Sequence, residues 1–72
     1  MPRVTGKEMI RFLVRRNFSL YRVKGSHHLM RNGEAQTVIP IHGNQDLKTG
    51  TLRGILRDIN MEPEEFERLW HH

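Results

Sequence analysis

The sequence contains no cysteine among its 72 residues, which excludes disulfide bonds and thiolate metal sites. Long apolar runs are also absent: none approaches the roughly 18 residues of a membrane-spanning helix, and no signal peptide is visible. We therefore expect a cytoplasmic protein without a membrane segment. A chain of this length is expected to form one domain, residues 1–72, near the small end of what folds without cross-links.

Acidic residues are scarce in most of the chain. Residues 1–57 hold eleven of the twelve Lys and Arg residues but only three of the eight Asp and Glu residues, a net charge of +8. A surface this basic suits a polyanion, and nucleic acid is the simplest such partner. The alternative is that the charge only keeps the protein in solution.

The N-terminal part of the chain predicts a short amphipathic helix over about residues 6–16. Thr5 and Glu8 have the spacing of a capping box, in which each side chain accepts a hydrogen bond from the other residue's backbone N–H. Asn17 is a plausible left-handed residue to end the helix.

A second helix is predicted from apolar residues at positions i, i+3, i+4 and i+7, which are Leu52, Ile55, Leu56 and Ile59. Thr49 or Thr51 is the expected N-cap, and Asn60 can end the helix. Pro63 suits the first position of a further short helix. We expect Phe66 of that helix to pack in the core.

Between the helices the sequence predicts three strands, over about residues 18–23, 27–31 and 35–41. Gly25-Ser26 predicts a turn or a bulge, because glycine tolerates a positive φ. Asn32-Gly33 is a strong signal for a hairpin turn. Pro40 cannot donate a hydrogen bond to a neighbouring strand, so the third strand should lie at a sheet edge or end there.

This order predicts an α+β fold, with a three-stranded antiparallel sheet covered on one face by two helices and a short extra C-terminal helix. The open face of the sheet, or its rim, is then left for a ligand. Double-stranded-RNA-binding domains use the same α-β-β-β-α arrangement, and they recognise RNA by its shape, 2′-hydroxyls and phosphates.

The strongest candidate for chemistry is the adjacent pair His27 and His28, directly after Gly25-Ser26. Histidine is the side chain most easily tuned to exchange protons near neutral pH. Cations that suit an anionic substrate lie close by in the sequence, namely Arg22, Lys24 and Arg31.

Three stretches of the chain together resemble the HicA toxins. They are Lys24-Gly25-Ser26-His27-His28, then Val38-Ile39-Pro40-Ile41-His42, then the run from Leu47 to Arg57. The resemblance covers roughly residues 5–69. It implies a fold similar to the double-stranded-RNA-binding domain, an mRNA-cleaving activity, and a cognate HicB antitoxin that holds the toxin inactive.

In that family one histidine after the Gly-Ser pair is the functional residue, and this sequence has both His27 and His28. Strand alternation puts His27, Leu29 and Arg31 on one face and His28 and Met30 on the other. Met30 suits the core and Arg31 suits solvent, so His27 should face out and His28 in. Leu29 argues the reverse, and a bulge would reset the register. We favour His27.

The implied reaction is cleavage through the neighbouring 2′-hydroxyl, with His27 taking its proton and a cation stabilising the developing charge. This route needs neither a metal nor a small-molecule cofactor. His42 would serve as the acid if the third strand brings it beside the first histidine, and otherwise it caps a loop. The residues expected to bind RNA are Arg22, Lys24, Gly25, Ser26, Arg31 and His42.

The sequence also suits other functions. The same basic face also suits a non-catalytic RNA-binding module, or a small domain that binds an acidic protein. A His-rich metal site is not expected, because the spacing of His27, His28 and His42 matches no known zinc pattern. Thr49-Gly50-Thr51 would suit a bound phosphate at a helix start or an ordinary cap. We assign His71-His72 no role.

Overall fold

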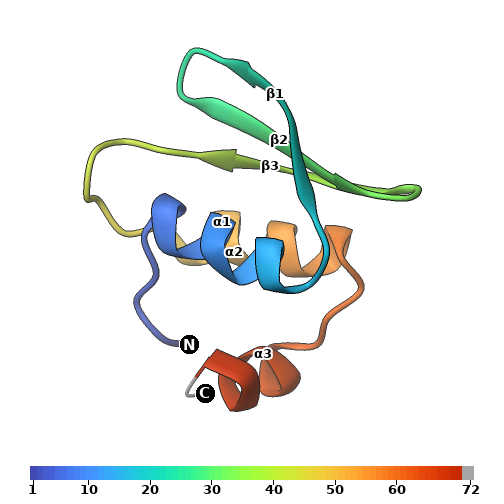
Figure 1. Ribbon diagram of the computed structural model, residues 1–72. Coiled ribbons are helices and arrows are strands. Elements are labelled where there is room, and N and C mark those ends of the chain that lie inside the picture. Colours follow the sequence, from blue (N-terminus) through green and yellow to red (C-terminus); the bar gives the residue numbers. More distant parts are fainter. Residues whose placement is uncertain (71–72) are drawn as a thin grey trace.

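A computed structural model describes residues 1–70 and shows one helix, three strands and two further helices in that order (Figure 1). His71 and His72 lie outside the described residues. The elements are α1 (Gly6–Arg15), β1 (Ser19–Lys24), β2 (His27–Asn32), β3 (Ala35–Pro40), α2 (Thr49–Asp58) and α3 (Pro63–Trp70). The strands form one antiparallel sheet in the order β1-β2-β3, so β2 is central and β3 is an edge strand as predicted. The predicted α+β fold is confirmed.

Both predicted ends of α1 are confirmed. The Thr5 hydroxyl accepts a hydrogen bond from the Glu8 backbone N–H at 3.1 Å, and the Glu8 carboxylate accepts from the Thr5 N–H at 2.9 Å. Hydrogen bonding of the Glu8 carboxylate by Thr5, first by its backbone N–H and then by its side chain, holds the pKa of Glu8 below its usual range. Asn17 follows the helix with a φ of 69°, in the left-handed region.

Each hairpin has a two-residue loop that begins with glycine. Gly25-Ser26 joins β1 to β2, and Gly33-Glu34 joins β2 to β3. Gly25 and Gly33 have φ values of 59° and 60°, whereas Ser26 and Glu34 do not have a positive φ. This pattern matches type II′ turns, whose twist suits a hairpin.

The second turn lies one residue later than the sequence suggested. Asn32 is the last residue of β2 and pairs with Ala35, so it is not part of the two-residue loop. Its side-chain amide donates a hydrogen bond to the backbone carbonyl of Arg16 at 3.3 Å. This bond connects the end of the strand to the end of α1.

The start of α2 also corrects a prediction. Lys48 is the N-cap, with an extended backbone (φ −65°, ψ 148°) and no side-chain hydrogen bond to the helix. The prediction of Thr49 or Thr51 as the cap is therefore wrong, because Thr49 already has a place inside the helix. Asn60 ends this helical segment with a φ of 57°. None of the helices within residues 1–70 is long and apolar enough to cross a membrane.

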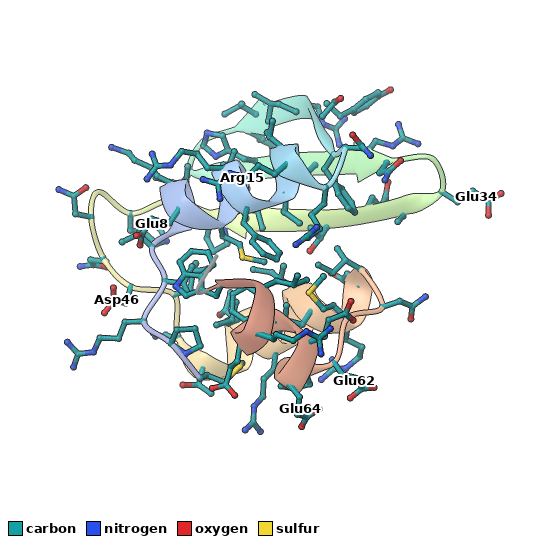
Figure 2. The ribbon with its side chains drawn as sticks, turned by 60° about the horizontal axis from the view of Figure 1, so that its bottom comes forward. Glu8, Arg15, Glu34, Asp46, Glu62 and Glu64 are labelled. Carbon is teal, nitrogen blue, oxygen red and sulfur yellow. The ribbon has the colours of Figure 1, made fainter. Side chains whose placement is uncertain are left out.

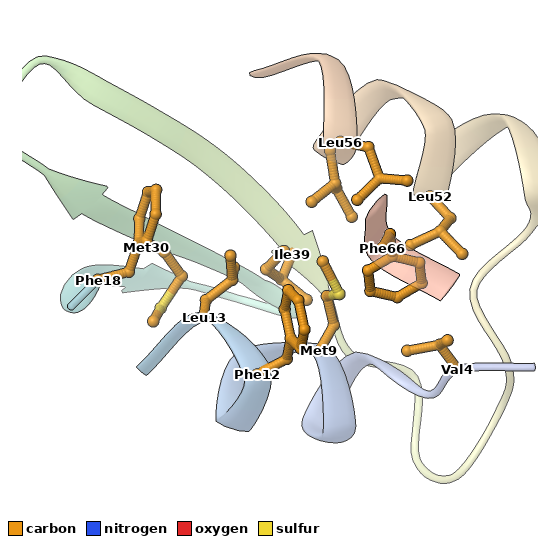
Figure 3. Packing of buried hydrophobic residues seen from close by; sticks show 11 residues of the cluster. Val4, Met9, Phe12, Leu13, Phe18, Met30, Ile39, Leu52, Leu56 and Phe66 are labelled. Atoms are coloured by element: carbon orange, nitrogen blue, oxygen red, sulfur yellow. The ribbon is translucent and has the colours of Figure 1, made fainter. Parts of the chain in front are cut away.

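The core lies between the sheet and the helices (Figure 3). The fully buried side chains include Met30 and Ile39 from the sheet and Met9, Leu13, Leu56 and Phe66 from the helices. Phe66 packs edge-on against Phe12, with ring centroids 5.1 Å apart, as expected for a core residue. Trp70 stays half-buried beside it.

The helices cover only part of the sheet. Their main contacts are with β3, and all six residues of β1 are exposed. Figure 1 shows β1 at the side of the sheet away from α2. The expectation that both helices cover one face therefore holds for β2 and β3, while β1 extends beyond them.

Candidate nucleic-acid interface

The face of the sheet that turns away from the helices is basic. Residues paired directly across antiparallel strands point to the same side, so the pairs Lys24–His27 and Arg22–Leu29 share this face. With β3 they form a shallow depression with a volume of about 310 Å³. We call it the open-face depression; its lining residues are Arg22, Lys24, His27, Leu29, Gln36 and Val38.

None of the described residues that line the open-face depression is a carboxylate. The acidic side chains labelled in Figure 2 lie elsewhere. They are Glu8 in α1, Glu34 at the tip of the second hairpin, Asp46 in the loop before α2, and Glu62 and Glu64 near the start of α3. The Lys and Arg side chains that line the depression are Arg22 and Lys24. A concave surface lined by charge of one sign concentrates ligands of the opposite sign.

His27 is held by the pairing of β2 on both sides. It is exposed, it faces Lys24 across the first hairpin, and it pairs with Pro40 of β3. The carbonyl of Ser26 accepts a hydrogen bond from the Ile41 N–H at 2.8 Å, which continues the contact between β2 and β3 past Pro40. The imidazole is thus placed by backbone hydrogen bonds and remains open to solvent.

His28 points the other way. It pairs with Val23 and with the buried Ile39, so its side chain lies on the helix side of the sheet. It is half-buried, and its Nδ1 lies 3.2 Å from the carbonyl oxygen of Ser26. The orientation of both histidines agrees with the alternation argument. Their catalytic roles remain predictions.

Leu29 is the apolar residue that conflicted with the predicted outward direction of His27, because it shares the face of His27. It lies on the open face opposite Val38, and this pair forms an apolar floor between the basic side chains and Gln36. Leu29 is half-buried there, although it does not belong to the core. Neither Leu29, Val38 nor Gln36 was expected in the site, because their place depends on how the strands pair.

Arg31 lies on the same face, four residues beyond His27 on β2. The carbon of its guanidinium group is 4.3 Å from the centroid of the Tyr21 ring. The pairing of β1 with β2 shifts register between Leu20 and Arg22, which is the mark of a β-bulge at Tyr21. The sequence suggested a bulge or turn only at Gly25-Ser26, and did not single out Tyr21.

The structure does not bring His42 into the open-face depression. His42 is exposed in the loop after β3 and lines a separate depression of about 200 Å³ together with Asp46, Lys48 and Thr51. We therefore do not assign it the role of acid beside His27. Its contact with RNA remains a prediction.

The histidines do not form a metal site within the part of the chain described. No group of three or more His, Cys, Asp or Glu residues among residues 1–70 is placed to hold a metal ion. His27 and His28 point to opposite faces of the sheet, and His42 lies in a different depression.

Fold and site together define a small α+β domain with the element order of the double-stranded-RNA-binding domain and a basic open sheet face. A family model described as the HicA toxin of bacterial toxin–antitoxin matches residues 6–61. The chain therefore belongs to the HicA toxin family and has the role of toxin in a toxin–antitoxin pair. The matched range contains all of α1, β1, β2, β3 and α2. Comparisons with curated proteins and with solved structures gave no match.

Proposed function

We propose that this toxin is an mRNA interferase, an endoribonuclease that cuts mRNA at the open-face depression without a metal ion. The observation that carries the proposal is the Lys24–His27 pair, which presents an exposed imidazole and a cation on the same carboxylate-free surface. A general base must reach its proton directly, and its substrate here is a polyanion.

In the proposed reaction, the His27 imidazole takes the proton of a ribose 2′-hydroxyl. The 2′ oxygen then forms a bond to the adjacent phosphorus, and the bond from phosphorus to the 5′ oxygen of the next nucleotide breaks. The leaving oxygen takes a proton from water, so the products carry a 2′,3′-cyclic phosphate and a 5′-hydroxyl. The Lys24 ammonium stabilises the negative charge that develops on the phosphate oxygens.

The rest of the face holds the RNA. Arg22 and Arg31 supply further positive charge for the backbone phosphates. The Gly25-Ser26 turn lies beside the pair, and a Cβ at Gly25 would meet no atom within 4 Å. A phosphate can therefore approach the backbone of this turn closely.

The antitoxin is proposed to be of the HicB type and to bind the same surface. The basic residues around His27 are where an acidic protein gains most from long-range attraction. A protein bound there also excludes RNA, so one contact both recognises and inhibits the toxin. We place both partners in the cytoplasm, where mRNA is present.

A second candidate is a non-catalytic RNA-binding module of the same fold. One observation favours it. Among the described residues that line the open-face depression, His27 has the only imidazole and none has a carboxylate, so no second such group is present to protonate the leaving oxygen. Incubation of the purified protein with labelled mRNA separates the two. Fragments that accumulate with time, and not with His27→Ala, support the nuclease. Tight binding without fragments supports the binding module.

A further inference from the structure

We infer that Tyr21 and Arg31 form a base-stacking subsite for single-stranded RNA on the open face of the sheet. This inference rests on the proposed function, and it adds that the RNA substrate is single-stranded. The subsite lies at the end of β2 opposite to His27 and contains Tyr21, which takes no part in the proposed cleavage step.

The β-bulge places the Tyr21 ring on this face. Arg22 pairs with Leu29 and lies on the open face, so simple alternation would turn Tyr21 toward the helices. The residue before it, Leu20, pairs with the buried Met30 and so lies on the helix side of the sheet. Tyr21 is therefore the extra residue of the bulge, between Leu20 on one side and Arg22 on the other. Bulges re-aim side chains in this way, and here the ring reaches Arg31.

The ring contributes little to the core. Tyr21 is 61% exposed, the largest fraction among the exposed large apolar side chains, while Arg31 is half-buried. The guanidinium carbon lies 4.3 Å from the ring centroid, a cation–π distance that holds the two groups together. Unpaired RNA bases stack on aromatic rings and on guanidinium planes, with little dependence on base identity.

The distance between the Tyr21–Arg31 pair and His27 determines which nucleotide of the RNA the subsite binds. Four residues along a strand span about 14 Å, which separates Arg31 from His27 on β2. A stacked nucleic-acid strand advances about 3.4 Å per nucleotide. The subsite therefore takes a base up to about four nucleotides from the bond that is cut. A base held in a duplex is already stacked and paired, so the subsite selects single strands.

The test uses binding of a short unstructured oligoribonucleotide to protein carrying His27→Ala, which prevents cleavage. Tyr21→Leu removes the ring and keeps an apolar side chain, whereas Tyr21→Phe keeps the ring and is the matched control. We expect the Leu variant to bind between about fivefold and about 150-fold more weakly, the range for the loss of one stacked base. The Phe variant should bind like its parent.

A ribose-phosphate strand without bases separates stacking from a structural effect. The parent and the Leu variant should bind this strand equally, with the same salt dependence, because Tyr21 carries no charge. Equal binding of the ordinary oligoribonucleotide by both proteins would overturn the subsite. An equal loss of affinity for the ordinary oligoribonucleotide and for the strand without bases would also overturn it.

Failure of the subsite can be told apart from failure of the proposed function. The same oligoribonucleotide is also incubated with the protein that retains His27. If it is cut while Tyr21→Leu has no effect on binding, the subsite is wrong and the nuclease proposal stands. If it is neither bound nor cut, and mRNA is not cut either, the proposed function fails and the subsite with it.

Discussion

Lys24 and His27 are direct partners across the first hairpin, and their side chains share the open face of the sheet. Both positions are fixed by strand pairing and by a tight turn, since Gly25 adopts a φ of 59°. Functional groups on regular elements are held in place better than those on loops. The imidazole of His27 and the ammonium group of Lys24 are therefore positioned together by the backbone.

The first prediction compares the two histidines in cells. His27→Ala should abolish growth arrest while the protein still folds, because an exposed imidazole contributes little to stability. His28→Ala should remain toxic and lose about 1 kcal/mol of stability with its contact to Ser26. Growth after induction, together with thermal unfolding of both variants, checks this. An inactive His28 variant would show that the catalytic face has been assigned wrongly.

Much of the fold could be predicted because its signals are local. The capping box of Thr5 and Glu8 and the left-handed Asn17 depend on residues a few positions apart. The direction of His27 follows from alternation along a single strand. The Lys48 cap shows the limit of such signals, because two nearby threonines appeared to be better caps than the residue that the chain uses.

The remainder of the site depends on contacts between strands. The bulge at Tyr21 is defined by the register of β1 against β2, which the sequence of β1 alone does not contain. The apolar floor of Leu29 and Val38 likewise exists only because these residues are paired. Which depression His42 lines depends on the path of the loop after β3.

The second prediction concerns salt. The double substitution of Lys24 and Arg31 by alanine should weaken RNA binding. It should also make the slope of log affinity against log salt less steep by up to about 1.4, because each lost phosphate contact reduces the slope by about 0.7. A matched control replaces Arg11 and Arg15 of α1, which should leave the slope unchanged. The opposite result would place the RNA on α1.

The third prediction tests the packing of α1 against β3. A Cβ on Gly6 would lie 2.5 Å from the Pro40 carbonyl oxygen, so Gly6→Ala should cost about 1–3 kcal/mol of stability. Gly54→Ala in α2 is the control, since a Cβ there meets nothing within 4 Å. It should gain up to about 1 kcal/mol from helix propensity. Chemical denaturation measures both, and a Gly6 variant as stable as the parent would contradict the contact.

The fourth prediction concerns the antitoxin. It should displace RNA stoichiometrically, with one antitoxin binding site for each toxin molecule. It should also shield Lys24, Arg31 and either His27 or His28 from solvent. Competition with labelled RNA measures displacement, and chemical modification of Lys24 in the free and bound toxin measures shielding. If the complex still cuts RNA at the full rate, the antitoxin does not cover the open-face depression, and the proposed mode of inhibition is wrong.

The proposed function is tested most directly by cleavage of one RNA by the purified toxin in excess chelator, with analysis of the fragment ends. The proposed function predicts that the RNA is cut to fragments with 2′,3′-cyclic phosphates and 5′-hydroxyls. It also predicts that the all-deoxy strand of the same sequence stays intact, and that His27→Ala slows cleavage by at least about a hundredfold. Activity that disappears with the chelator and returns with a divalent ion, or cutting of the deoxy strand, would contradict it.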